Sequence, residues 1–337
     1  MSEFYPFGRR AGLRTTFSVG MGFVIVFAIV PAAAVIVISL TDIRGLPYIP
    51  VNWVGIENYL TFFSGAKLGY NLHALWNTLV FAFSVTIFQN FIALMIAVVL
   101  STKLRGRTFY RAVVFMPTVL GVTVIGLIWS LIFNPSAGPA ATVWSWFGAD
   151  SAFFGDQKIA MALVISVQVW AGLGLAVVIF LAGIQAIPEE LYECASIDGA
   201  SGSKKLRHIT VPLLAPSFTA NVLLCIVGSL QSYQLAYVLT GPNNPATQVL
   251  SLAIFTQAFG GGTSSGSVAS QGYAGAISMV QFVIVGLISV VVLLYLRRQE
   301  SKTLPRWPLA NLATAPDGPR DRRVGVLADG LSRQASL

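Results

Sequence analysis

Hydrophobic side chains gather into six long runs, and shorter polar stretches separate them. Each run is long enough to cross the roughly 30 Å hydrocarbon core of a bilayer as an α-helix, which needs about 20 residues. None of the runs contains Asp, Glu, Lys, Arg or His. The pattern therefore predicts an all-α polytopic membrane protein with six transmembrane helices, at residues 17–40, 77–100, 112–133, 160–182, 217–239 and 274–296.

Composition supports this interpretation, because 55% of the residues are hydrophobic and only 10% are charged, against roughly 25% charged in typical soluble domains. The first run follows three arginines, as a signal peptide would. Its apolar stretch is about twice the length of a signal core, so we expect a retained helix. The two cysteines, Cys194 and Cys225, predict neither a disulfide framework nor a metal site.

Basic residues predict the orientation. Only Arg44, Lys67 and Lys158 fall outside if the N-terminus is placed in the cytoplasm. The other 18 Lys and Arg lie in the inner segments 1–16, 101–111, 185–213 and 297–337. Cytoplasmic loops of membrane proteins carry such an excess, so we expect both termini to be cytoplasmic. The net charge of +8 then has a topological cause, and nucleic-acid binding is not needed to explain it.

The same features divide the chain into four parts. We expect a cytoplasmic N-terminal tail at 1–16, a first transmembrane helix with its outer loop at 17–72, a core of five transmembrane helices at 73–296, and a disordered cytoplasmic tail at 297–337. In the outer segments, the stretch near Ile56–Phe63 is expected to form either an interfacial helix or a plain connector, and Leu250–Phe259 a surface helix.

The cytoplasmic segment 187–216 carries the most distinctive pattern. Pro188 suits the start of a helix, and the glutamates that follow suit the positive end of its dipole. Gly199 interrupts this helix, and Ser203 can cap a second one that ends near Pro212. Two short helices around a glycine, beneath a membrane bundle, indicate a docking element for a partner protein.

The residues of this segment resemble the EAA loop of ABC importer permeases. That pattern is Glu-Ala-Ala, three residues, Gly, nine residues, Ile, one residue, Leu-Pro; here it starts at Glu193 and differs by Cys194 and Val211. The resemblance implies a type I ABC importer permease architecture and a set of ATPase-coupling residues: Glu190, Glu193, Cys194, Ala195, Asp198, Gly199, Ile209 and Pro212.

Other motifs resemble the carbohydrate branch of these permeases, which includes maltose-type and glycerol-phosphate-type importers. They are Trp76-Asn77-Thr78, the run Leu104–Ala112, Met116-Pro117, and Trp129 to Pro135. The resemblance implies a multi-pass subunit of the cytoplasmic (inner) membrane that imports a sugar or polyol by alternating access. The implied partners are a dimer of ABC ATPases, a second permease subunit that is usually a different chain, an extracytoplasmic solute-binding protein, and membrane lipid.

The chain itself is expected to be a non-catalytic permease subunit without a bound cofactor, while the partner ATPase uses ATP and Mg²⁺. No phosphate-binding G-x-x-x-x-G-K-[ST] motif occurs. No span holds the ionisable groups that ion-coupled carriers generally use, although a sodium-coupled secondary transporter remains an alternative. An intramembrane enzyme is disfavoured, because the spans contain no paired carboxylates, metal-ligand cluster or nucleophile–base pair.

The substrate path is expected on the spans that flank the loop, where polar, small and aromatic residues recur without charge. Small and polar residues of the fifth span fall at three- and four-residue spacing and share one helical face, which suits either helix packing or a neutral solute. The residues expected to line the path are Gln168, Trp170, Gly172, Ser229, Ser232 and Tyr233.

Overall fold

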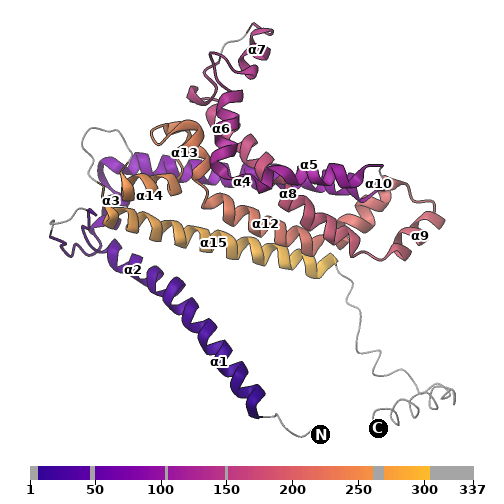
Figure 1. Cartoon of the computed structure of the whole chain (residues 1–337), viewed down its shortest axis with the longest axis horizontal. Helices are drawn as coiled ribbons and strands as arrows, with labels where there is room; N and C mark the ends of the chain where they lie inside the picture. The colour runs from indigo at the N-terminus through magenta and orange to yellow at the C-terminus, as the bar shows by residue number, and fades with distance from the viewer. Residues whose placement is uncertain (1–6, 46–49, 103–104, 149–150, 261–268, 304–337) are drawn as a thin grey trace.

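The computed structural model describes residues 7–45, 50–102, 105–148, 151–260 and 269–303, which form an elongated helical bundle (Figure 1). Its long helices are α4 (Leu68–Ser101), α8 (Ala160–Gln185), α12 (Ala215–Leu230) and α15 (Gln271–Thr303). Helix α4 packs on both α8 and α12, and α12 also packs on α15. The described part of the chain is all-α apart from one isolated bridge between Thr41 and Trp53.

Shorter helices surround these four. Helices α1 (Phe7–Val24) and α2 (Val30–Ser39) are joined by a π-helical turn at Ile25–Ile29. The others are α3 (Glu57–Phe63), α5 (Arg107–Val119), α6 (Val122–Ile132), α7 (Pro139–Ser145), α9 (Glu189–Ile197), α10 (Gly202–Lys205), α11 (Val211–Leu213), α13 (Gln234–Thr240) and α14 (Leu250–Phe259). Single helical turns occur at Gly65–Lys67, Phe153–Gly155, Leu206–Thr210 and Pro245–Thr247.

The two ends of the bundle differ. Helices α3 and α14 lie at one end, and α9 and α10 lie at the other, near the C-terminal end of α15 (Figure 1). The turn before α5 is also at the α9 end, so three of the basic segments share one end of the molecule. This is the grouping that the basic-residue count predicts.

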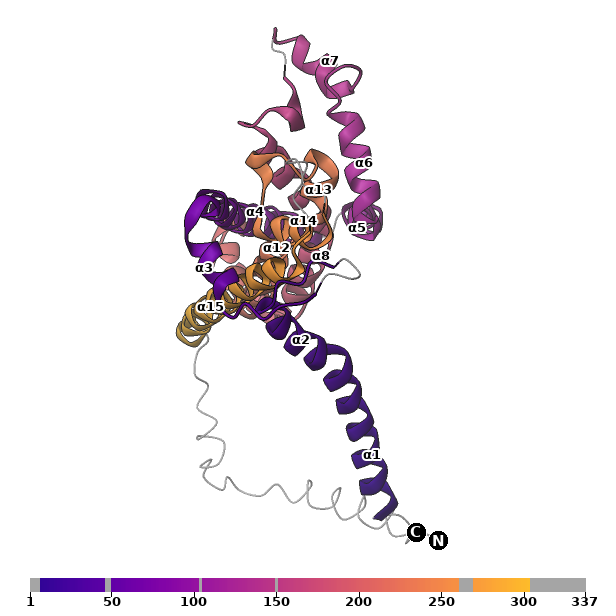
Figure 2. The same cartoon turned by 90° about the vertical axis from the view of Figure 1, so that its left-hand side faces the viewer.

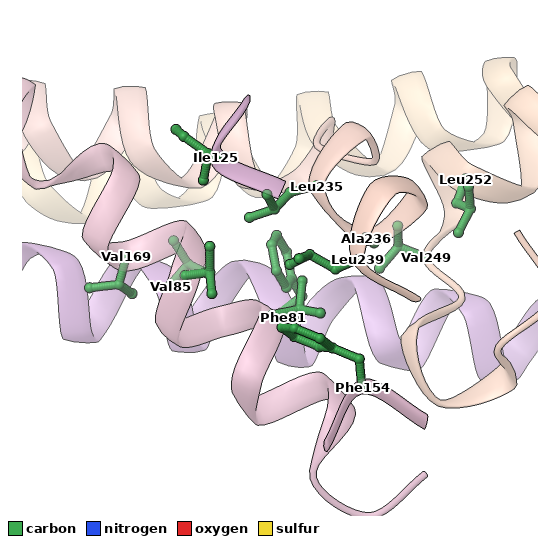
Figure 3. Packing of buried hydrophobic residues seen from close by; sticks show 12 residues of the cluster. Phe81, Val85, Ile125, Phe154, Val169, Leu235, Ala236, Leu239, Val249 and Leu252 are labelled. Carbon is green, nitrogen blue, oxygen red and sulfur yellow. The ribbon is translucent and has the colours of Figure 1, made fainter. Parts of the chain in front are cut away.

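The largest core cluster lies where α4 and α8 meet α6 and α13. Figure 3 shows Phe81 and Val85 of α4 with Leu235 and Leu239 of α13. In lipid, helices associate by close packing rather than by the hydrophobic effect. At Gly174, a side chain would collide with Thr118 and with the backbone at Phe115, so this glycine allows α8 to approach α5 closely.

Four of the six predicted spans are confirmed as continuous apolar helices among the described residues: Thr16–Ser39, Leu68–Ser101, Ala160–Gln185 and Gln271–Arg298. The other two are not single continuous helices. The bent pairs are Arg107–Val119 with Val122–Ile132, and Gly202–Leu213 with Ala215–Leu230, and a count of six holds only if each pair is one span. Near Ile56–Phe63 the structure has the helix α3 and not a plain connector, while its position at the membrane interface stays a prediction.

The prediction of one continuous helix at 112–133 is wrong. Helices α5 and α6 meet there at 101°, because Leu120 and Gly121 both adopt extended backbone conformations. Pro117 cannot donate a backbone hydrogen bond within this helix. Hydropathy records only that the segment is apolar, so it could not reveal the bend. Helix α6 then leads away from the bundle axis towards α7 (Figures 1 and 2).

The prediction of one continuous helix at 217–239 is also wrong. Helix α12 ends at Leu230 and α13 begins at Gln234, with three non-helical residues between them. A free carbonyl at membrane depth needs a partner, and Leu230 has two. Gln281 Nε2 donates to the Leu230 carbonyl at 3.1 Å, and Ser251 Oγ donates to it at 3.3 Å.

Two further expectations need correction. Helix α14 has the predicted bounds, but it is not a surface helix, because Leu250, Leu252 and Ala253 are buried against neighbouring helices. Helix α15 continues past residue 297 to Thr303, and α1 begins at Phe7, so both predicted tails are partly helical. The rest of the predicted tails, 1–6 and 304–337, lies outside the described residues.

Helix α1 stands apart from the bundle, whereas α2 packs on α15 near Ser39 (Figures 1 and 2). The most apolar stretch of Thr16–Ser39 buries no side chain within the chain. This stretch therefore offers its apolar surface to its surroundings.

Candidate functional site

The segment 187–216 folds as two short helices joined by a tight turn, as predicted. Helix α9 follows Pro188, which is its N-cap residue rather than its first helical residue. Glu189 and Glu190 lie in the first turn, where carboxylates interact favourably with the helix dipole. The second helix starts at Gly202 with Ser201 as its N-cap, so the expected cap at Ser203 is wrong by two residues.

Gly199 ends α9 in a left-handed conformation with φ of +72°. The Ala200 N–H donates to the Ala195 carbonyl at 2.9 Å, and the Gly199 N–H donates to the Ser196 carbonyl at 3.1 Å. This pair of hydrogen bonds is a Schellman motif, which favours glycine at the left-handed position. A Cβ at Gly199 would meet no atom within 4 Å, so backbone conformation, not crowding within the chain, requires the glycine.

Side-chain hydrogen bonds join α9 to the helix that follows it. The hydroxyls of Tyr192 and Thr210 are 2.9 Å apart and share a hydrogen bond. Lys205 Nζ donates to Ser196 Oγ at 2.6 Å, and Ser196 Oγ donates to the Tyr192 carbonyl at 2.7 Å. The second helix leads through a 66° bend at Leu214 into α12. Helix α9 is therefore connected to the membrane bundle by contacts as well as by the chain.

The outer surface of α9 is acidic and apolar. Of the predicted coupling residues, four have exposed side chains: Glu190, Glu193, Cys194 and Asp198. Ala195, Ile209 and Pro212 are half-buried, and Ile209 lies in the π-helical turn. Leu191 and Ile197 are also exposed, Ile197 by 86%, although both are apolar. The loop pattern did not identify Ile197, because it is not part of the motif.

The second candidate site lies at the break between α12 and α13, where Ser232 approaches Gln168 of α8. The Ser232 hydroxyl is 3.5 Å from Gln168 Oε1. Tyr233 stacks on Phe255 of α14 with a centroid distance of 5.1 Å. Of the predicted path residues, Ser232 and Tyr233 therefore lie at the break, and Gln168 and Trp170 lie on the facing helix α8.

Aromatic side chains gather at this break. Trp170 meets Trp129 of α6 edge to face, with centroids 5.5 Å apart. The indole N–H of Trp129 is buried, and no acceptor among the described residues receives it. We did not predict Trp129 or Phe255 for the site, because only the tertiary fold brings α6 and α14 to α8 and α13.

The other two predicted path residues are involved in helix packing. Ser229 is only 4% exposed. Gly172 is covered by Gln89 of α4, whose Nε2 donates to the Gly172 carbonyl at 3.1 Å. A Cβ at Gly172 would be 2.6 Å from Gln89 Oε1. Neither residue faces an open path within this chain.

Metal binding has no support among the described residues, since no three His, Cys, Asp or Glu side chains are grouped to hold an ion. Both cysteines have free thiols.

Comparison with known proteins gives a consistent result. Residues 89–302 match the family described as "Binding-protein-dependent transport system inner membrane component". The multiple sugar-binding transport system permease protein MsmF of Streptococcus mutans is 31% identical over 75% of this chain and 84% of its own length. The trehalose/maltose transport system permease protein MalF of Thermococcus litoralis is also 31% identical, over 80% of this chain and 88% of its own.

A solved structure shows the same fold. A chain of a bacterial ABC transporter involved in the import of the acidic polysaccharide alginate superimposes with a TM-score of 0.73 at 20% identity. The superposition covers 86% of this chain and 96% of that one. A second structure, of a bacterial alginate ABC transporter in complex with alginate pentasaccharide-bound periplasmic protein, has a TM-score of 0.68 at 19% identity.

Proposed function

This chain belongs to the family of binding-protein-dependent transport system inner membrane components, and on that premise we propose that it imports an uncharged sugar or polyol. It is a multi-pass membrane permease subunit of an ABC importer. ATP is hydrolysed by a separate subunit, and the 187–216 loop receives the resulting motion. The chain has no catalytic role and binds no nucleotide.

The observation that carries the coupling role is the rigid, exposed pair of helices at one end of the bundle. Helix α9 presents carboxylates and the apolar side chains Leu191 and Ile197 to the exterior. Exposed apolar groups surrounded by charged ones are typical of protein interaction sites. Hydrogen bonds join α9 to the helix leading into α12. Closure of a partner around α9 would therefore tilt α12 as a rigid body.

The uncharged break between α12 and α13 supports a neutral solute. Gln168 and Ser232 supply hydrogen-bonding groups without charge. Tryptophan and tyrosine rings nearby provide flat apolar faces that suit the C–H faces of a sugar ring. Relatives named for multiple-sugar and trehalose/maltose transport point to the same class of solutes.

The partners follow from this role. We expect a dimer of ATPase subunits at the α9 end. A second permease subunit, which is a different polypeptide chain, would lie beside the bundle. An extracytoplasmic binding protein would deliver the solute to the α3 and α14 end. Both termini would be cytoplasmic, because three of the four basic segments gather at the α9 end and the N-terminal segment is also basic.

Uptake into proteoliposomes tests the proposal. The chain would be purified with its co-expressed subunits and supplied with loaded binding protein outside and ATP inside. We expect uptake of radiolabelled maltooligosaccharides or a related neutral sugar that requires ATP and is blocked by vanadate. A sodium-coupled carrier would instead accumulate solute under an imposed sodium gradient without ATP, and that result would overturn the proposal.

A further inference from the structure

A groove lies between α4 and α5 at the basic end of the bundle. It has a volume of about 730 Å³, and its walls are the apolar side chains Met95, Ile96, Val99, Leu100 and Val114. It forms because α4 and α5 both pack closely on α8 but contact each other little. The result is an apolar slot between α4 and α5.

Two polar side chains lie at the mouth of the slot, Arg105 and Tyr110. Arg105 is exposed, and no side chain that the structure describes accepts a hydrogen bond from its guanidinium. Gly106 turns the chain with φ of +80°, and the Tyr110 ring folds back towards this turn. The arginine and the phenol hydroxyl are therefore free to bind a ligand.

The sequence segment that contains Arg105 is positively charged and has no acidic residue nearby along the chain. Residues 103–111 include Lys103, Arg105, Arg107 and Arg111, and no Asp or Glu occurs between Ser101 and Ala149. A guanidinium binds phosphate oxygens in bidentate fashion. Basic sites between transmembrane helices at the cytoplasmic surface suit anionic lipid headgroups.

We propose that this groove is a binding site for one anionic phospholipid. An acyl chain lies in the slot along Val99 and Val114, and the phosphate is held by Arg105 and the Tyr110 hydroxyl. The apolar walls favour a lipid over free phosphate, because a phosphate ion would leave the slot empty. The site depends on the membrane position of this end of the bundle and not on the identity of the transported solute.

Native mass spectrometry of the purified importer complex tests the site, with phosphatidylglycerol and phosphatidylcholine of identical acyl chains as probes. We expect the wild type to retain phosphatidylglycerol preferentially. Arg105→Gln should weaken that retention about fivefold, which corresponds to ~1 kcal/mol for one basic residue near the headgroups. Tyr110→Phe should weaken it less, and Val99→Trp should fill the slot and remove both lipids.

Arg107→Gln is the matched control, since it removes the same charge two residues away without touching the groove. Equal retention of both lipids by the wild type would overturn the site. An equal loss in the Arg107 and Arg105 variants would also overturn it, since diffuse attraction would then explain the preference. Cross-linking of a cysteine at Val99 to another subunit would show that the occupant is protein instead of lipid.

Discussion

Gly199 is the residue on which the shape of the 187–216 loop depends. Its φ of +72° costs an L-amino acid roughly 1–2 kcal/mol, and a β-branched residue more. We therefore expect Gly199→Val to displace α9 from its partner without affecting insertion of the bundle. ATP-driven uptake should be lost, and less ATPase should co-purify with the chain, while membrane levels of the chain stay normal.

Gly202→Val is the control for this substitution. Gly202 lies in the same loop, has no positive φ, and a Cβ there meets no atom within 4 Å. This variant should retain most of the uptake. If Gly199→Val transports at the wild-type rate with its ATPase attached, the loop is only a connector and the coupling role is wrong.

A substitution of Gln168 tests the candidate solute site. Its side chain faces Ser232 across the helix break. Gln168→Leu should raise the solute concentration for half-maximal uptake by about three- to tenfold, as expected for the loss of a hydrogen bond worth ~0.5–1.5 kcal/mol. ATPase assembly should not change. Ser166→Ala, on the same helix, removes a hydroxyl that bonds only to its own helix at Leu163, so it should leave uptake unaltered. An equal effect of both variants would assign Gln168 to packing.

At the scale of elements, the sequence revealed the helices better than their bends. Long uncharged runs predicted the four continuous spans, because apolar length is a local property. The break after Leu230 depends on Gln281 and Ser251, which lie far along the chain and pair with the freed carbonyl. The turn at Gly199 was predictable for the opposite reason, since local hydrogen bonds define it.

Gln281 should therefore stabilise the break between α12 and α13. Gln281→Leu removes the shorter hydrogen bond to the buried Leu230 carbonyl and leaves only the one from Ser251, and the loss of one hydrogen bond costs about 0.5–1.5 kcal/mol. We expect a lower thermal unfolding temperature of the detergent-purified complex, together with reduced uptake. Ser289→Ala is the control on the same helix, because its hydroxyl bonds only to the Val285 carbonyl within α15. Equal stability of the two variants would contradict the role of Gln281.

At the scale of the whole molecule, the chain is incomplete by itself. The span Thr16–Ser39 buries none of its most apolar stretch, and α9 exposes the apolar side chain of Ile197. The candidate solute site is likewise one-sided in the part of the chain that the structure describes, with hydrogen-bonding groups from α8 and the α12–α13 break. These surfaces have different expected neighbours, which are lipid or a second permease for the span and an ATPase for α9.

The native thiol of Cys194 reports on both orientation and assembly. It is exposed on α9, whereas Cys225 lies half-buried in α12 and can be replaced by serine. In a Cys225→Ser background, a membrane-impermeant maleimide should label Cys194 in inverted vesicles and not in intact cells. Labelling should fall further when the ATPase is present, because α9 would then lie in its cleft.

A cysteine introduced at the exposed Ser64, near the α3 end, should give the opposite sidedness in a Cys194→Ala variant. Labelling of Cys194 from outside intact cells would reverse the orientation, and unchanged labelling with the ATPase bound would place the docking surface elsewhere.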